Sequence, residues 1–285
     1  MQPQWADPVG LSLPFVQVHE LCDSATGERR QLSVSQSHGG SAAPKASRLL
    51  VLLDGNLTVV PAALMLHTRG ERDHGCLPAC TVAGVGYPDV RFYDQQRRAR
   101  DFLPALPEPL DAATWPGGRA DAFSAFLDAQ LLPWLEAQQG HAYTEIGLFG
   151  HSYGGLFTLY KLLHQPARFN AFFSISPSLW WGNGWLLDRL GPVAQQCAGR
   201  SVFLGIGADE RAMPGADATR VDLHKARDVQ GRFARLVHEF QLHNVACTAE
   251  TYAGEDHGSV LYPALTRAVR WLIRPAGNDH NALQH

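Results

Sequence analysis

The chain alternates between short apolar runs and longer segments in which apolar residues recur at helical spacing. The runs are almost continuously apolar, which is typical of parallel strands that are buried on both faces of a sheet. Five such runs occupy residues 48–56, 80–87, 145–150, 169–177 and 201–207. Each is therefore predicted to be an inner strand of one sheet.

Two segments that precede these runs have a different pattern. Residues 15–21 and 29–36 alternate between apolar and polar side chains and are joined by a turn-rich stretch. This pattern predicts an antiparallel hairpin at an edge of the sheet. A last strand is expected at 247–254, which makes a sheet of about eight strands.

Helical spacing predicts helices between the strands. They cover residues 59–68, 119–138, 153–165, 219–241 and 260–273. Strands that alternate with helices connect by right-handed crossovers and form a doubly wound sheet. The expected fold class is therefore α/β, with a mostly parallel sheet and an N-terminal antiparallel hairpin.

Residues 88–118 interrupt this rhythm. The segment is rich in proline and arginine, carries aromatic residues and has no clean period, which favours a long functional loop or a small cap. At 285 residues and 45% hydrophobic, the chain can bury a large core, and one domain is expected over residues 1–285. The tail at 275–285 is expected to be frayed.

Charge and hydropathy disfavour several function classes. The formal net charge is −3, which gives no excess of cations for nucleic-acid phosphates, so no nucleic-acid partner is expected. No apolar stretch approaches the roughly 20 residues that span a bilayer, so no membrane role is expected. Residues 1–15 lack the basic start and apolar run of a secretory signal. A cytoplasmic location is expected, or a periplasmic one if a leader has been removed.

The five cysteines are odd in number and scattered, unlike a disulfide framework. Cys76 and Cys80 lie close to His74, but no second ligand pair follows them as it does in zinc sites. They are interpreted as ordinary thiols, and no metal is expected.

The string Gly150-His151-Ser152-Tyr153-Gly154 follows a predicted strand and opens a helix. G-x-S-x-G strings also arise by chance, but this placement is that of a nucleophile elbow. At such a turn the serine takes strained backbone angles, and the glycines remove Cβ atoms that would collide. Ser152 is therefore the candidate nucleophile, presented at the carboxyl edge of the sheet.

A serine hydroxyl is a poor nucleophile until a base takes its proton. In this fold class the base is a histidine in the loop after the last strand, and His257 occupies that place between Gly254 and Gly258. His151 is adjacent to the serine in sequence. It is expected to point away from the serine hydroxyl, as a packing or hydrogen-bonded residue.

The acid that orients His257 is expected after the strand at 201–207. Asp209 and Glu210 stand there, and Asp209 is favoured. Glu210 and Asp256 are alternatives, and a serine–histidine dyad without a carboxylate is a further one.

Acyl transfer also needs N–H donors for the oxyanion of the tetrahedral intermediate. One candidate is the amide of Tyr153, which follows the nucleophile. The second is expected from Gly55 or Asn56, at the end of the strand at 48–56. No proton transfer is assigned to Asp54.

Several strings accompany Ser152 and His257. They are LLDGN at 52–56, VGY at 85–87, RRARDFLP at 97–104, GHSYGGLF at 150–157, SISPSLWWGN at 174–183 and EDHGSV at 255–260. Together they resemble the putative esterase family of α/β-hydrolases, the esterase D-like group. Within it, they are most similar to the bacterial ferric siderophore esterases that cleave enterobactin, salmochelin and bacillibactin trilactones. The resemblance covers roughly residues 12–273.

This resemblance implies an α/β-hydrolase fold and serine ester hydrolysis without a metal or an organic cofactor. It carries the nucleophile and base onto Ser152 and His257. Some family members work without a clear acidic partner for the base, so the resemblance leaves the acid open. It also implies that Tyr153 and the loop at 53–56 form the oxyanion site.

The resemblance further implies that the arginines before DFLP neighbour the substrate. Arg97, Arg98 and Arg100 lie among aromatic residues, and guanidinium groups beside aromatic faces suit a bulky anion such as a ferric tris-catecholate. The alternative is a solvated, salt-bridged loop that holds a cap. Trp180 and Trp181 either wall the acyl pocket or pack a loop.

The predicted function is hydrolysis of a small-molecule carboxylic ester through an acyl-enzyme. An acyltransferase and a thioesterase, such as an S-formylglutathione hydrolase, would use the same residues. A catalytically silent binding module is an alternative from another class. The substrate and the oligomeric state stay open at this level.

Overall fold

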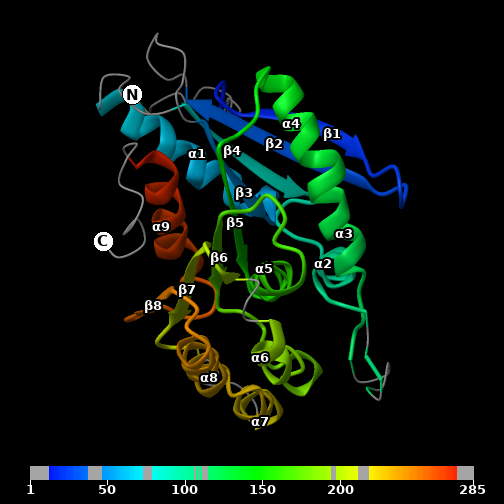
Figure 1. Ribbon diagram of the computed structural model, residues 1–285, viewed down its shortest axis with the longest axis vertical. Coiled ribbons are helices and arrows are strands. Elements are labelled where there is room, and N and C mark those ends of the chain that lie inside the picture. The colour runs from blue at the N-terminus through cyan, green and yellow to red at the C-terminus, as the bar shows by residue number, and fades with distance from the viewer. Residues whose placement is uncertain are drawn as a thin grey trace, which may run out of the picture.

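The central sheet has eight strands in the order β1-β2-β4-β3-β5-β6-β7-β8 (Figure 1). The computed structural model describes residues 13–37, 47–72, 79–105, 107–108, 110, 115–193, 197–210 and 218–274. The predicted tail, the cluster of Cys76 with His74, and part of the segment 88–118 lie outside the described residues.

Every predicted strand is present, and the class prediction of a mostly parallel α/β sheet is confirmed. The strands are β1 (Gln17–Cys22), β2 (Arg29–Ser37), β3 (Ser47–Leu53), β4 (Ala79–Gly86), β5 (Glu145–His151), β6 (Ala171–Ile175), β7 (Ser201–Gly207) and β8 (Cys247–Tyr252). The hairpin of β1 and β2 is antiparallel and forms one edge. The other six strands run parallel to one another.

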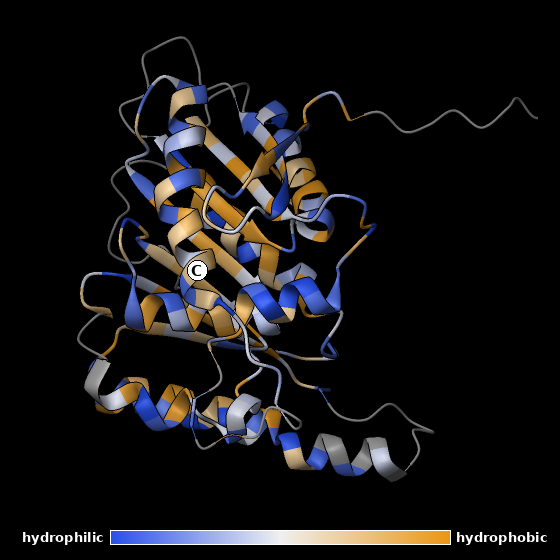
Figure 2. Cartoon of the chain, turned by 90° about the vertical axis from the view of Figure 1, so that its right-hand side faces the viewer, coloured by the Kyte–Doolittle hydropathy of each residue, from blue (hydrophilic) through white to orange (hydrophobic). Residues whose placement is uncertain are grey.

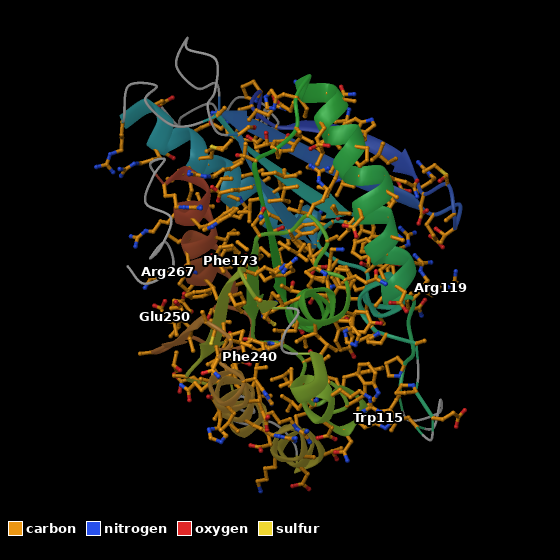
Figure 3. The ribbon with its side chains drawn as sticks, in the orientation of Figure 1. Trp115, Arg119, Phe173, Phe240, Glu250 and Arg267 are labelled. Carbon is orange, nitrogen blue, oxygen red and sulfur yellow. The ribbon has the colours of Figure 1, made fainter. Side chains whose placement is uncertain are left out.

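Successive residues of a strand point to opposite faces of the sheet, and both faces are buried. Leu49 and Val51 of β3 face one core, while Leu50 and Leu52 face the other. Phe173 of β6 belongs to the second core (Figure 3). Helices α1 (Gly55–Arg72) and α9 (Leu261–Ile273) cover that second core.

The first core lies under the remaining packed helices, and hydrophobic residues gather in the sheet and on the sides of the helices that face it (Figure 2). These helices are α2 (Gln95–Phe102), α3 (Ala120–Phe126), α4 (Leu132–Gln139), α5 (Tyr153–His164), α6 (Leu190–Val193) and α8 (Val229–Leu242). Among the helices within the described ranges, none is long and apolar enough to cross a bilayer.

Two predicted helices are interrupted in the structure. The segment 119–138 contains a π-helical stretch at Leu127–Leu131 between α3 and α4, in which Asp128 accepts a 2.8 Å hydrogen bond from the buried Lys161. The segment 219–241 is divided at Asp228, which has a φ of +40°, into α7 (Ala218–Arg227) and α8. Both interruptions depend on local backbone chemistry that apolar spacing does not report.

Helix α2 was not predicted, because the segment 88–118 shows no helical period. The helix is short, and three of its eight residues are arginines, so it presents no apolar stripe to recognise. Asp94 precedes the helix as its N-cap, and its side chain accepts hydrogen bonds from the amides of Gln96 and Arg97. These capping hydrogen bonds stabilise the start of the helix, and they do not depend on the spacing of apolar residues.

The order of the strands reverses direction at the centre of the sheet. The chain passes from β3 outward to β4, and β5 then pairs with the opposite side of β3 before the chain continues to β8. In open α/β sheets, such a switch point leaves a crevice at the carboxyl ends of the strands. The residues that follow β3 and β5, from Asp54 and Ser152 onward, stand at this edge.

Candidate active site

Ser152 lies at the sharp turn between β5 and α5. Its φ is +61° and its ψ is −118°, a strained combination for a residue with a side chain. The turn is held by the Ser152 amide, which donates a 3.0 Å hydrogen bond to the carbonyl of Ile175. A Cβ atom at Gly155 would lie 2.7 Å from that same carbonyl oxygen, and one at Gly150 would overlap Gly154. The predicted elbow is therefore present.

His257 reaches the serine from the loop after β8. Its Nε2 atom is 3.1 Å from Ser152 Oγ, so the pairing expected from chain order is found. Asp256 shapes this loop by accepting hydrogen bonds from the amides of Gly258 and Ser259, each at 2.8 Å. These bonds lower the pKa of Asp256, which is engaged with the loop backbone.

Glu210, not Asp209, contacts the other side of the imidazole. Glu210 Oε2 is 2.8 Å from His257 Nδ1. Its Oε1 accepts a 3.0 Å hydrogen bond from the Gly207 amide and another from the Ser176 hydroxyl. The Glu210 side chain is 2% exposed. The carboxylate is thus buried and fixed by three partners.

The prediction that Asp209 orients His257 is therefore wrong. After β7 the chain turns so that the Asp209 amide donates a 3.0 Å hydrogen bond to the carbonyl of Glu255, in the loop that carries the histidine. This places Asp209 at the partly exposed outside of the turn and directs Glu210 inward. The inward residue of a turn depends on backbone geometry, which adjacency in sequence does not specify.

His151 binds the loop that carries His257. Its Nε2 donates a 2.6 Å hydrogen bond to the backbone carbonyl of His257. Burial, together with the neighbouring His257, lowers the pKa of His151 to about 3, so its ring stays neutral near pH 7. The prediction of a hydrogen-bonded histidine at this position is confirmed, and the bond connects the elbow to the loop of the base.

The catalytic residues open into a cavity of about 470 Å³, within the range of small-molecule sites. Ser152, His257 and Glu210 contribute to its lining together with Tyr93, Tyr153, Ser178, Trp180, Arg98 and Arg227. The Ser178 hydroxyl lies 3.4 Å from Ser152 Oγ. Neither Ser178 nor Arg227 was identified from the sequence. Ser178 lies within the string SISPSLWWGN, of which only the two tryptophans were considered, and Arg227 lies outside every quoted string.

One predicted oxyanion donor is at the cavity. Helix α5 begins at Tyr153, so the amide of this residue belongs to the first turn, where N–H groups have no intrahelical acceptor. Gly55 and Asn56 do not line the cavity, although Asp54 and Leu57 do. Asn56 instead uses its side chain to bind the loop after β4, accepting from the Tyr87 amide at 2.9 Å. The second oxyanion donor remains a prediction.

The predicted arginine cluster is dispersed by helix α2. Helical residues advance by about 100° each, so Arg98 and Arg100 point about 160° apart around the helix and the three arginines cannot all face the cavity. Arg97 donates to the carbonyl of Pro88 at 3.2 Å, and Arg100 pairs with Glu28 at 2.5 Å. Among the three, the cavity lining includes Arg98 alone. The prediction that all three contact substrate is corrected accordingly.

Arg98 forms an ion pair with Asp54. Its Nε and Nη2 donate to the two carboxylate oxygens at 2.6 and 2.9 Å, and both side chains are 7% exposed. Burial raises the pKa of Asp54, while Arg98 acts in the opposite direction. The pair joins α2 to the end of β3, and the Nε and Nη2 donors of Arg98 are both used by Asp54.

Replacing Arg98 with methionine is expected to lower the free energy of unfolding by about 3–5 kcal/mol, because it leaves the buried Asp54 carboxylate without its partner. Urea denaturation monitored by circular dichroism measures this loss. Arg97→Met is the matched control in the same helix and should change stability by no more than about 0.5 kcal/mol. Equal effects of the two substitutions would contradict a structural role for the ion pair.

Trp180 and Trp181 have different positions. Trp180 lines the cavity, whereas Trp181 is 1% exposed and donates its Nε1–H to the carbonyl of Pro116 at 2.8 Å. The prediction of a pocket wall fits Trp180, and the packing alternative holds for Trp181. Within the described part of the chain, no three His, Cys, Asp or Glu side chains gather as a metal site would require.

Comparison with known proteins decides the family. Residues 37–272 match the sequence profile of the family described as "Putative esterase". The chain belongs to this family. It is similar to the "Siderophore enterobactin esterase" of Emericella nidulans, with 29% identity over 259 residues that cover 83% of this chain and 85% of the relative. It is also similar to the "Ferri-bacillibactin esterase BesA" of Bacillus subtilis, with 27% identity over 275 residues, 93% of this chain and 92% of the relative.

The fold of the esterase agrees with solved structures. The "Siderophore hydrolase EstB from Aspergillus nidulans" superimposes with a TM-score of 0.81 at 25% identity, covering 94% of this chain and 98% of the other. The predicted α/β-hydrolase fold is thereby confirmed. The chain is a serine esterase, as its family and its relatives indicate.

Proposed function

We propose that this esterase hydrolyses the ester bonds of ferric siderophore trilactones through an acyl-enzyme on Ser152. The observation that carries the chemistry is the continuous chain from Glu210 through His257 to Ser152, with distances of 2.8 and 3.1 Å. The substrate class is supported by the names of the two relatives described above, both of which act on siderophores.

The geometry supplies each proton transfer of an acyl-transfer cycle. The Glu210 side chain accepts the Nδ1–H of His257, which leaves the Nε2 lone pair directed at the Ser152 hydroxyl. His257 takes the hydroxyl proton as Ser152 Oγ attacks the ester carbonyl, and the oxyanion that forms lies near the first amides of α5. His257 then returns the proton to the departing alcohol. Water repeats the same steps to release the acid.

Three such cycles would degrade a trilactone completely. The first opens the ring to a linear trimer. The second cleaves the trimer to a dimer and a monomer, and the third cleaves the dimer to two monomers. The ordered appearance of these products distinguishes repeated hydrolysis from a single ring opening.

The test is incubation with ferric and iron-free enterobactin-type trilactones, in parallel with p-nitrophenyl butyrate, followed by chromatography of the products. Sequential formation of linear trimer, dimer and monomer is expected. Turnover of p-nitrophenyl butyrate without any trilactone opening would retain the esterase and overturn the siderophore substrate. An added competing alcohol reports acyl transfer as a new ester, and a matched thioester reports thioesterase preference.

A further inference from the structure

Arg227 brings a second guanidinium to the cavity, from the last residue of α7. Its Cζ atom lies 4.2 Å from the centroid of the Trp180 ring, and both side chains line the cavity that contains Ser152. The Trp180 ring is supported by Trp115 at 6.4 Å, a residue marked in Figure 3. The guanidinium group therefore lies over an indole ring that is itself packed.

The two cavity arginines differ in how their charge is balanced. Arg98 is bound by both oxygens of Asp54. In the part of the chain that the structure describes, no carboxylate lies within ion-pair distance of Arg227. Its Nε atom is buried without a hydrogen-bond acceptor. The wall formed by Arg227 and Trp180 thus brings to the cavity of Ser152 a positive charge that no described carboxylate balances.

A guanidinium fork binds anionic oxygens that lie in a plane, and an indole beside it favours an aromatic ring. A catecholate combines both features. Each catecholate carries two negative charges, so a ferric tris-catecholate is a trianion. Each hydroxamate carries one, so a ferric tris-hydroxamate is neutral. A positively charged wall is therefore expected to favour the trianion over the neutral complex.

We propose that Arg227 and Trp180 bind one anionic catecholate arm of the substrate and thereby select ferric tris-catecholate esters over ferric tris-hydroxamate esters. This inference rests on the proposed function, because it names the substrate class at the same site. The arm is distant from the bond that breaks, so its charge does not change during the reaction. Its contribution to binding is then the same in the ground state and the transition state, and its loss raises KM.

The experiment compares kcat/KM for three substrates: a ferric tris-catecholate trilactone, a ferric tris-hydroxamate triester and p-nitrophenyl butyrate. In Arg227→Gln, the ratio of the catecholate value to the p-nitrophenyl butyrate value should fall about 10- to 100-fold, as expected for loss of a hydrogen bond to a charged group. The fall should come through KM. Arg227→Lys keeps the charge without the planar fork and should lose less.

A matched control exists outside the cavity. Arg189 lies 4.7 Å from the centroid of the Trp185 ring and is exposed, so Arg189→Gln removes the same charge from a similar arginine–tryptophan contact. This substitution should leave kcat/KM unchanged for all three substrates. A fall of the same size in Arg189→Gln, or an equal loss for all three substrates in Arg227→Gln, would overturn the inference.

Failure of the proposed function gives a different result. If the wild-type enzyme opens no siderophore ester, two p-nitrophenyl esters are used as substrates instead. They are the anionic hemisuccinate and the neutral butyrate. A selective loss of hemisuccinate turnover in Arg227→Gln would keep the anion site and reject the siderophore substrate. An unchanged ratio for this pair would reject the anion site as well.

Discussion

Ser152→Ala is expected to lower kcat for p-nitrophenyl butyrate by about 10³-fold or more. Ser152 Oγ is the atom that His257 Nε2 approaches at 3.1 Å, and without it no acyl-enzyme forms. Steady-state kinetics measure the loss, and a fluorophosphonate probe reports the nucleophile directly, since the probe should label the wild-type enzyme and not the variant. His257→Ala should cost a comparable factor, because serine and histidine act as a unit.

The chain offers a matched serine for this experiment. Ser178 Oγ lies 3.4 Å from Ser152 Oγ in the same cavity, but no base contacts it among the described residues. Ser178→Ala should retain probe labelling and lose less than about tenfold in kcat, the size of a lost neutral hydrogen bond. Labelling that persists in Ser152→Ala and disappears in Ser178→Ala would mean that the nucleophile has been misassigned.

Glu210→Gln is expected to lower kcat by about 10²- to 10⁴-fold. The amide oxygen of glutamine would accept from the Gly207 amide and the Ser176 hydroxyl, where Oε1 now lies. Its NH₂ group would then face His257 Nδ1. A donor at this place forces the histidine tautomer that carries its proton on Nε2. The proton then points at Ser152, and the base cannot accept another.

The adjacent carboxylate provides the control. Asp209 lies beside Glu210 in sequence but does not contact the imidazole, so Asp209→Asn should change kcat by no more than about twofold. Measuring both variants on p-nitrophenyl butyrate, with folding checked by circular dichroism, separates the two carboxylates. A larger loss in Asp209→Asn than in Glu210→Gln would restore the assignment made from the sequence alone.

Long apolar runs made the sheet predictable. A strand buried on both faces needs almost continuous apolar sequence, and each of the five runs forms an inner strand. The same regularity located Ser152 and His257, because each follows a recognisable strand and the carboxyl ends of parallel strands share one edge. Two residues 105 positions apart could therefore be paired without coordinates.

The details of the site were decided by tertiary structure. Asp209 and Glu210 differ by one position in a turn, and only the backbone hydrogen bond from the Asp209 amide to Glu255 shows which side chain faces the imidazole. The arginines of α2 looked like one cluster because the sequence does not show that they occupy a helix. Because they are helical, they cannot all face the cavity, and the one that lines it, Arg98, is paired with Asp54.

Sequence by itself determined the α/β class, the strands and the nucleophile with its base, because burial of apolar strands and the strand-to-helix turn leave local patterns. Tertiary structure alone decided the acid, the partner of each arginine and the place of Arg227 over Trp180. These depend on the directions of side chains brought together from distant segments. Such directions follow from turns, caps and packing, which leave no period in the sequence.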